Sequence, residues 1–222
     1  MSSYMSYNIP ITIKGLIYLK YEWKKSEKNF YGAREKPKLI IVPSQQFIAI
    51  DGIGNPNNAD FSNKVSALYS LAYSIKMIFK SKMKNETEDK ITDFTVFPLE
   101  GIWRGQKEET LDKSKLIYTI MIKQADFITE ELFNEALETV KKKKPSHLYD
   151  EISFKRIEDG KSIQILHIGS YDNEHHSFEK MDLLRDELKL TRLKDSHREI
   201  YLNNKNRTAE EKLKTILRYS VK

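Results

Sequence analysis

The sequence repeats one order of patterns. In the first half, the apolar run "FIAIDGIGNPN" ends in a glycine turn and is followed by an amphipathic stretch and then "FPLEGIW". In the second half, "ILHIGSYDNEH", another amphipathic stretch and "HREIYL" follow in the same order. Short apolar runs bounded by turn residues favour strands, whereas apolar residues at every third or fourth position favour helices. The repeat predicts an α+β protein made of two related modules with antiparallel sheets, helices on one face and a groove between the modules.

The same periodicities give the expected elements. Strands are expected over residues 39–51 (broken at Pro43), 93–104, 115–123, 151–157, 162–171 and 196–202, with a charged hairpin after 104. Helices are expected over residues 61–80, with Asp60 as N-cap, and over 129–143 and 177–188. Thr208 and Glu211 form a capping-box pair, which predicts a last helix that contains Leu213, Ile216 and Leu217.

The composition excludes several classes of protein. The chain of 222 residues has no cysteine, which excludes disulfides, zinc–thiolate sites and cysteine nucleophiles and suits a reducing cytoplasm. Its longest apolar runs are far shorter than the ~20 residues that span a bilayer. The N-terminal stretch lacks a basic leader and a small-residue cleavage site. We therefore expect a cytoplasmic protein without a membrane partner.

The basic charge does not indicate nucleic-acid binding. The net charge is +6, from 38 basic and 32 acidic residues, but the lysines are spread along the chain. The densest cluster, residues 141–144, falls at the end of an expected helix, where cations are favourable. No arginine-rich recognition helix or aromatic–basic motif is present. We expect a lysine-rich, solvated surface and no nucleic-acid partner.

The common cofactor and catalytic motifs are absent. "GIGNPN" is not a dinucleotide-binding fingerprint, and no phosphate-binding Walker sequence or GxSxG elbow occurs. The chain has 5 histidines, and none has HExxH or comparable metal-ligand spacing. The sequence predicts no cofactor and no metal.

The stretch "HREIYL" concentrates polar groups on one side of a strand. Strand alternation places His197, Glu199 and Tyr201 on one face and Ile200 and Leu202 on the other. Either water covers the polar face, or the three side chains act together in a site. Alternation alone favours the first reading, in which Glu199 is a solvated or ion-paired strand residue.

Seven motifs in order resemble one family. They are "YEWKKSEKNFY", "FIAIDGIGNPN", "ALYSLAYSIK", "FPLEGIW", "LHIGSYDNE", "HREIYLNNKNRT" and "EKLKTILR". From about Tyr21 to the C-terminus the chain resembles GyrI-like small-molecule-binding proteins, in particular the stand-alone bacterial group. The resemblance implies a duplicated strand-helix-strand-strand domain over residues 19–222, with repeats at about 39–128 and 129–222. Residues 1–18 would then be an N-terminal extension or the result of an early start codon.

The resemblance also implies a function. Relatives include drug-sensing domains of regulators and proteins that hydrolyse the strained cyclopropane of DNA-alkylating toxins, and some relatives bind a topoisomerase. It implies a groove between the repeats that binds hydrophobic, aromatic or cationic small molecules. The alternative is a non-catalytic protein that sequesters drugs or binds a protein partner. The chain departs from the family pattern at Arg104 and Arg198, where Trp and His are common, and these changes would alter the polarity of the groove.

Glu199 is the predicted catalytic residue. A carboxylate buried among aromatic rings attracts cations, and its ionised form is costly unless it is paired. These properties would let Glu199 accept a proton from water. Glu100 is its expected counterpart in the first repeat, although Pro98 and Gly101 beside it leave the direction of its side chain open.

The other predicted ligand contacts are aromatic residues and histidines. Aromatic rings can form flat walls for a planar or cationic ligand, each cation–π contact contributing roughly 0.5–2 kcal/mol. Two histidines are in strand phase with other candidates and could orient Glu199 or a water. For every one of these residues, ordinary packing is the alternative. The set comprises Tyr69, Tyr73, Trp103, Tyr171 and Tyr201, together with His167 and His197.

Overall fold

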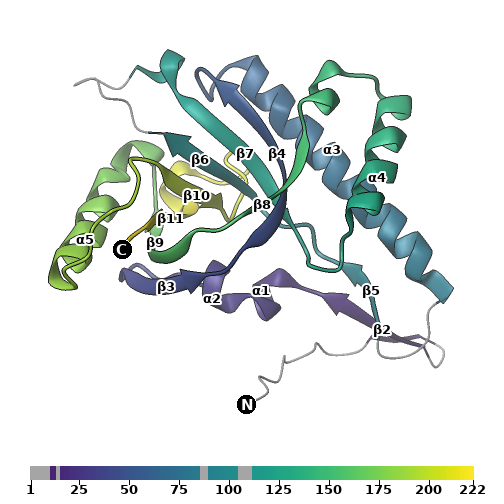
Figure 1. Cartoon of the computed structure of the whole chain (residues 1–222), viewed down its shortest axis with the longest axis horizontal. Helices are drawn as coiled ribbons and strands as arrows, with labels where there is room; N and C mark the ends of the chain where they lie inside the picture. The colour runs from purple at the N-terminus through teal and green to yellow at the C-terminus, as the bar shows by residue number, and fades with distance from the viewer. Residues whose placement is uncertain (1–10, 14–15, 86–89, 105–111) are drawn as a thin grey trace.

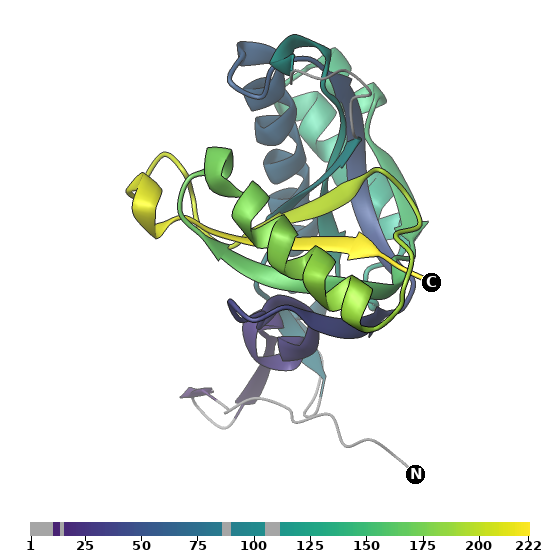
Figure 2. The same cartoon turned by 90° about the vertical axis from the view of Figure 1, so that its left-hand side faces the viewer.

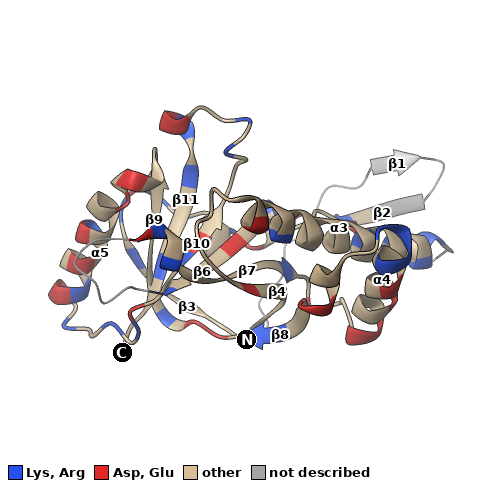
Figure 3. Ribbon diagram, turned by 90° about the horizontal axis from the view of Figure 1, so that it is seen from above, with Lys and Arg blue, Asp and Glu red and all other residues tan. Residues whose placement is uncertain are grey.

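A mixed α+β fold with one large antiparallel sheet is found in the computed structural model, which describes residues 11–13, 16–85, 90–104 and 112–222. This confirms the expected fold class. A smaller sheet has the order β1-β2-β5. The helices α3, α4 and α5 pack on one side of the large sheet (Figures 1 and 2). On α4 the acidic residues precede the lysines, which gather at its C-terminal end, whereas acidic and basic residues are mixed along α5 (Figure 3).

The large sheet has the strand order β3-β9-β11-β10-β6-β7-β4-β8. Its strands are β3 (Lys38–Val42), β4 (Gln45–Ile53), β6 (Leu99–Arg104), β7 (Ile117–Gln124), β8 (Ser153–Ile157), β9 (Gly160–Ile168), β10 (His197–Tyr201) and β11 (Lys214–Ser220). The small sheet contains β1 (Ile11–Ile13), β2 (Leu16–Tyr21) and β5 (Ile91–Phe94). The helices are α1 (Trp23–Ser26), α2 (Lys28–Tyr31), α3 (Ala59–Lys82), α4 (Glu130–Lys143) and α5 (His175–Glu187).

The strand order is mirrored about the centre of the large sheet. Each half contains a strand, a helix and two further strands, β4-α3-β6-β7 and β9-α5-β10-β11. Within the sheet, the strands of the first half lie in the order β4-β7-β6 and those of the second half in the order β10-β11-β9. The strands β6 and β10 therefore pair at the centre. Figure 1 shows these two strands side by side. Residues of β6 and β10 that face the helices therefore meet at the seam between the two halves.

A second, crossed connection also joins the halves. β3 pairs with β9 from Lys38↔Gln164 to Val42↔Gly160. β4 pairs with β8 from Gln45↔Ile157 to Ala49↔Ser153, in the same register. The chain thus bends at residues 43–44 and 158–159 without losing register. This crossing brings Asp159 close to the arginines of β10 and β11.

The main core lies between the large sheet and the helices. Leu68, Leu71 and Ile75 of α3 are fully buried, at helical spacing, with Ile48 and Ile120 of the sheet in the same cluster. Each such side chain contributes about 1.5–3 kcal/mol by its burial. None of the described helices has a run of apolar residues long enough to cross a bilayer.

The opposite face of the sheet carries a buried ionic network. Arg198 donates to Glu100 at 2.9 Å and to Asp159 at 2.7 Å. Arg218 donates to the second oxygen of Asp159 at 3.2 Å, and the Tyr31 hydroxyl donates to Glu100 at 2.9 Å. Two arginines thus face two carboxylates, and the charges balance.

The last predicted helix is wrong. Residues 214–220 form strand β11, which pairs with β10 on one side and with β9 on the other, and only Glu210–Lys212 makes a helical turn. Pairing with two distant strands outweighs the local capping signal, as strand formation depends strongly on tertiary context.

Two smaller expectations also needed correction. Asn58, not Asp60, is the N-cap of α3, and Asp60 lies in the first turn. There a carboxylate still interacts favourably with the helix dipole. The stretch 93–104 splits into β5 and β6, because Pro98 cannot donate a ladder hydrogen bond. The expected charged hairpin falls mostly at residues 105–111, outside the described residues.

Candidate functional site

The central seam gathers acidic and aromatic side chains on the helix-covered face. Glu199 of β10 pairs with Gly101 of β6 and is 8% exposed. Around it lie side chains from β6, from β10 and from the start of α5. We call this set the Glu199 cluster; it consists of Trp103, Tyr171, Glu174, His197, Glu199 and Tyr201.

Hydrogen bonds position the polar groups of the cluster. The indole N–H of Trp103 donates to the Tyr201 hydroxyl at 2.9 Å. Tyr201 lies near enough to Glu199 for the charge of the carboxylate to act on its hydroxyl. His197 Nε2 lies 2.9 Å from Glu199 Oε1. Burial and the charge of Glu199 raise the pKa of Tyr201 well above its usual value, so the phenol stays protonated.

Aromatic rings surround these groups. Phe61 of α3 stacks on Trp103, with centroids 6.0 Å apart and ring planes at 23°. Tyr171 meets Tyr201 edge to face at 6.0 Å. The Trp103 indole is thereby fixed between the first half's helix and the second half's strand. Tyr171, His197 and Tyr201 are only partly buried, so the cluster can be reached from solvent.

Gly101 makes room for this arrangement. A Cβ atom at Gly101 would lie 2.8 Å from Trp103 Nε1 and 3.2 Å from the Tyr201 hydroxyl oxygen. The first distance is shorter than real Cβ contacts. The indole therefore crosses the strand at the one position where no side chain stands in its way.

We expect Gly101→Ala to displace the indole and to break its hydrogen bond to Tyr201. The clash should lower the free energy of unfolding by about 1–3 kcal/mol, the usual cost of an overpacked site. The measurement is best made in a Trp23→Phe background, because the chain has 2 tryptophans and Trp103 is then its sole reporter. Unchanged Trp103 emission together with unchanged stability would contradict this packing.

Glu174 is a second buried acid in the cluster. It precedes α5 and is 8% exposed, and its Oε1 has no hydrogen-bond partner among the residues that the structure describes. Burial, and then the charges of Glu199 and Asp172, raise its pKa to about 10. One donor atom each from Glu174, His197 and Glu199 lies within 4.8 Å of the others. These three residues could hold a metal ion.

The sequence patterns did not single out Glu174 or Phe61 as site residues. Phe61 falls at the start of the expected helix over residues 61–80 and is part of the main core. Glu174 stands in "SYDNEH", between a strand and a helix, and has no strand alternation that could show its direction. A single buried acid at a helix start is indistinguishable in sequence from the exposed acids that favour such positions.

Of the predicted contacts, Trp103, Tyr171, His197 and Tyr201 lie with Glu199 in the cluster. His167 is buried, and its ring nitrogens lie 2.9 Å from Ser177 Oγ and 2.9 Å from the Ser170 carbonyl oxygen. His167 thus joins β9 to the segment that leads into α5.

The two predicted tyrosines of α3 lie apart from these contacts. The Tyr69 hydroxyl accepts from the Leu99 amide at 3.2 Å. Tyr73 is 54% exposed and lies beside Tyr69, with ring centroids 6.4 Å apart.

Glu100 does not lie in the cluster, which corrects the expectation that it could be the counterpart of Glu199. Directly paired residues of antiparallel strands share a face. Glu100 pairs with Ile200, whereas Glu199 pairs with Gly101. Glu100 is therefore on the opposite face, in the network with Arg198. Arg198, which stands where the family commonly has His, also lies on the face away from the cluster. Arg104, which stands where the family commonly has Trp, is exposed.

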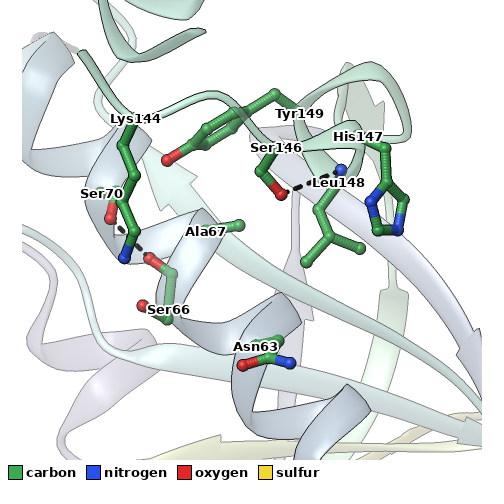
Figure 4. A pocket seen from close by; sticks show the side chains of 9 residues that line it. All are labelled: Asn63, Ser66, Ala67, Ser70, Lys144, Ser146, His147, Leu148 and Tyr149. Carbon is green, nitrogen blue, oxygen red and sulfur yellow. Dashed lines mark hydrogen bonds between the residues drawn. The ribbon is translucent and has the colours of Figure 1, made fainter.

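A separate pocket of about 190 Å³ lies between α3 and residues 144–149. Figure 4 shows Ser66 and Ser70 of α3 facing Lys144 and Tyr149 across it. Its lining residues are Asn63, Ser66, Ala67, Ser70, Lys144, Ser146, His147, Leu148 and Tyr149. None of the predicted ligand contacts is among them.

Comparisons with known proteins place the chain in a family. Residues 35–220 match the model of the GyrI-like small molecule binding domain. A hydrolase from Listeria innocua is 35% identical, with a TM-score of 0.80, over 91% of this chain and 100% of that protein's chain. An uncharacterized conserved protein from the same organism has 35% identity and a TM-score of 0.81 over the same shares. No curated protein matches the chain. This chain belongs to the GyrI-like small-molecule-binding family.

Proposed function

We propose that the protein binds hydrophobic, aromatic or cationic small molecules at the Glu199 cluster. The observation that carries this proposal is a carboxylate, 8% exposed, beneath aromatic side chains at the seam of the two halves. A cation that displaces water from this place gains attraction from Glu199 and from the faces of the rings.

The charges around Glu199 favour a cationic ligand. Among the described residues, neither Glu174 nor Glu199 forms an ion pair with a lysine or an arginine. The partner of Glu199 is His197, which bears a charge only when protonated. Burying the Glu199 carboxylate without a permanent counter-charge is unfavourable, and a bound cation relieves that cost.

A narrower form of the proposal is hydrolysis of an electrophilic cyclopropane. Glu199 would take a proton from a water whose oxygen attacks the strained ring carbon. The ring bond breaks and its electron pair moves to a conjugated carbonyl oxygen, which is then protonated. Release of ring strain drives the step, so positioning and one base supply most of the catalysis. The family membership and the 35% identity to a protein described as a hydrolase support this form.

Binding is tested by titrating the protein with rhodamine 6G, a planar lipophilic cation, and following its fluorescence anisotropy. We expect saturable binding that Glu199→Gln weakens at least tenfold, or about 1.4 kcal/mol. Nile red, a neutral planar dye, should lose much less affinity in the same variant. Glu187→Gln makes the same charge change at the exposed end of α5 and serves as the matched control.

The result separates the proposal from its alternative. Equal weakening of both dyes would show that Glu199 contributes packing rather than charge. No binding of either dye would favour the protein-interaction alternative, in which the cluster has no small-molecule ligand.

A further inference from the structure

We infer that Glu174, His197 and Glu199 form a binding site for a divalent transition-metal ion, with Zn²⁺ as the best fit. This inference goes beyond the proposed function and does not rest on it. The three residues come from two elements that pack together: Glu174 precedes α5, and His197 and Glu199 belong to β10. Their donor atoms all lie within 4.8 Å of one another.

The unpartnered oxygen of Glu174 points to a missing ligand. Glu174 is 8% exposed, and Oε1 makes no hydrogen bond to the described residues. A buried polar atom without a partner costs about 1–3 kcal/mol. The described residues contain four more such atoms, but Glu174 is the one whose residue belongs to a group of potential metal ligands. Here the orphaned carboxylate lies beside a second carboxylate and an imidazole, which is a donor set rather than a packing defect.

The charges around the three residues also favour the binding of a cation. The nearest buried arginines, Arg198 and Arg218, are on the opposite face and are committed to Glu100 and Asp159. In the described part of the chain the only charged partner of this acidic pair is His197, through Glu199. A divalent ion would displace the proton that Glu174 carries beside Glu199 and would bind both carboxylates.

The donor types select the ion. One imidazole nitrogen with two carboxylate oxygens suits Zn²⁺, whereas Mg²⁺ and Ca²⁺ prefer oxygen ligands alone. A tetrahedral zinc site with bonds of about 2.0–2.2 Å holds its donors ~3.3–3.6 Å apart, so the side chains must rotate inward from their present spacing of up to 4.8 Å. Three protein ligands leave a position open for water or an incoming group.

The test is calorimetric titration of the metal-free, untagged full chain with ZnCl₂. We expect one Zn²⁺ per chain and a thermal stabilisation that grows with Zn²⁺ concentration. Glu174→Gln and His197→Gln should each weaken Zn²⁺ binding at least tenfold. MgCl₂ should give no saturable binding. Circular dichroism spectra establish that both variants are folded; Glu174→Gln keeps the size and shape of the side chain and removes only the carboxylate that would bind the metal.

Matched controls address surface binding. His147 lies 3.9 Å from Glu151 and His176 lies 3.7 Å from Glu179, both as exposed histidine–carboxylate pairs. His147→Gln and His176→Gln should leave Zn²⁺ binding unchanged. The inference is overturned if Zn²⁺ does not bind saturably. It is also overturned if binding survives Glu174→Gln and His197→Gln, or is lost in either surface variant. Since no organic ligand is used, failure here is distinct from failure of the dye titration.

Discussion

Replacing Glu100 by leucine is expected to lower the free energy of unfolding by about 3–5 kcal/mol, the cost of breaking a buried ion pair from one side. Glu100 is 1% exposed and Arg198 3% exposed. The change removes the acceptor of one Arg198 hydrogen bond and of the Tyr31 hydroxyl hydrogen bond. Both donors would then be buried without those partners. Urea denaturation followed by circular dichroism measures the effect.

A double variant separates the charge effect from simple loss of packing. Glu100→Leu leaves two buried arginines with one carboxylate, that of Asp159. Arg198→Met in this background removes the excess positive charge, so the double variant should be more stable than Glu100→Leu alone. Lys141→Met, which breaks an exposed pair with Asp150, should cost less than about 1 kcal/mol. A cost for Glu100→Leu as small as that of the surface variant would show that the network contributes little to stability.

The two faces of β10 differ in charge balance. This difference separates a face that stabilises the fold from a face that is suited to binding a ligand. On one face, Arg198 and Arg218 pair with Glu100 and Asp159, so the charges balance, although Arg198 Nε has no hydrogen-bond partner among the described residues. On the other face, the charged partner of Glu199 in the described part of the chain is His197, and Glu174 Oε1 has no hydrogen-bond partner there. Buried charge that is compensated within the protein holds the two halves together. Uncompensated buried charge at an accessible seam is what a binding site requires.

Strand alternation was sufficient to place part of the site. In "HREIYL" it put His197, Glu199 and Tyr201 on one face, and all three belong to the cluster. Alternation could not show whether this face is covered by water or forms a site, because the answer depends on which strand pairs with β10. The pairing with β6, which brings Trp103 and Gly101 alongside, joins residues almost a hundred positions apart.

The failures have the same physical origin. Glu100 lies between Pro98 and Gly101, where strand alternation does not predict the direction of a side chain. Its pairing with Ile200 determines which face of the sheet it lies on. The segment after Thr208 carries a helix-start signal, yet β9 and β10 each offer it an unpaired edge. Local patterns thus identified most elements, whereas long-range pairing determined where their side chains meet.

Replacing Glu199 by glutamine is expected to slow hydrolysis of a carbonyl-conjugated cyclopropane by about 10²–10⁴-fold, the usual contribution of a general base. The amide keeps the size of the carboxylate but cannot take a proton from water. Because this substrate is neutral, kcat should fall while KM changes little, in contrast to the loss of cation affinity expected in the dye titration. The reaction is followed by chromatography and mass spectrometry in ¹⁸O-water, where the product should carry one labelled oxygen.

The exposed Glu187→Gln variant should react like the wild type. Equal rates for the wild type and Glu199→Gln would remove Glu199 from the chemistry, and a wild type without turnover that still binds the dye would leave the protein as a receptor.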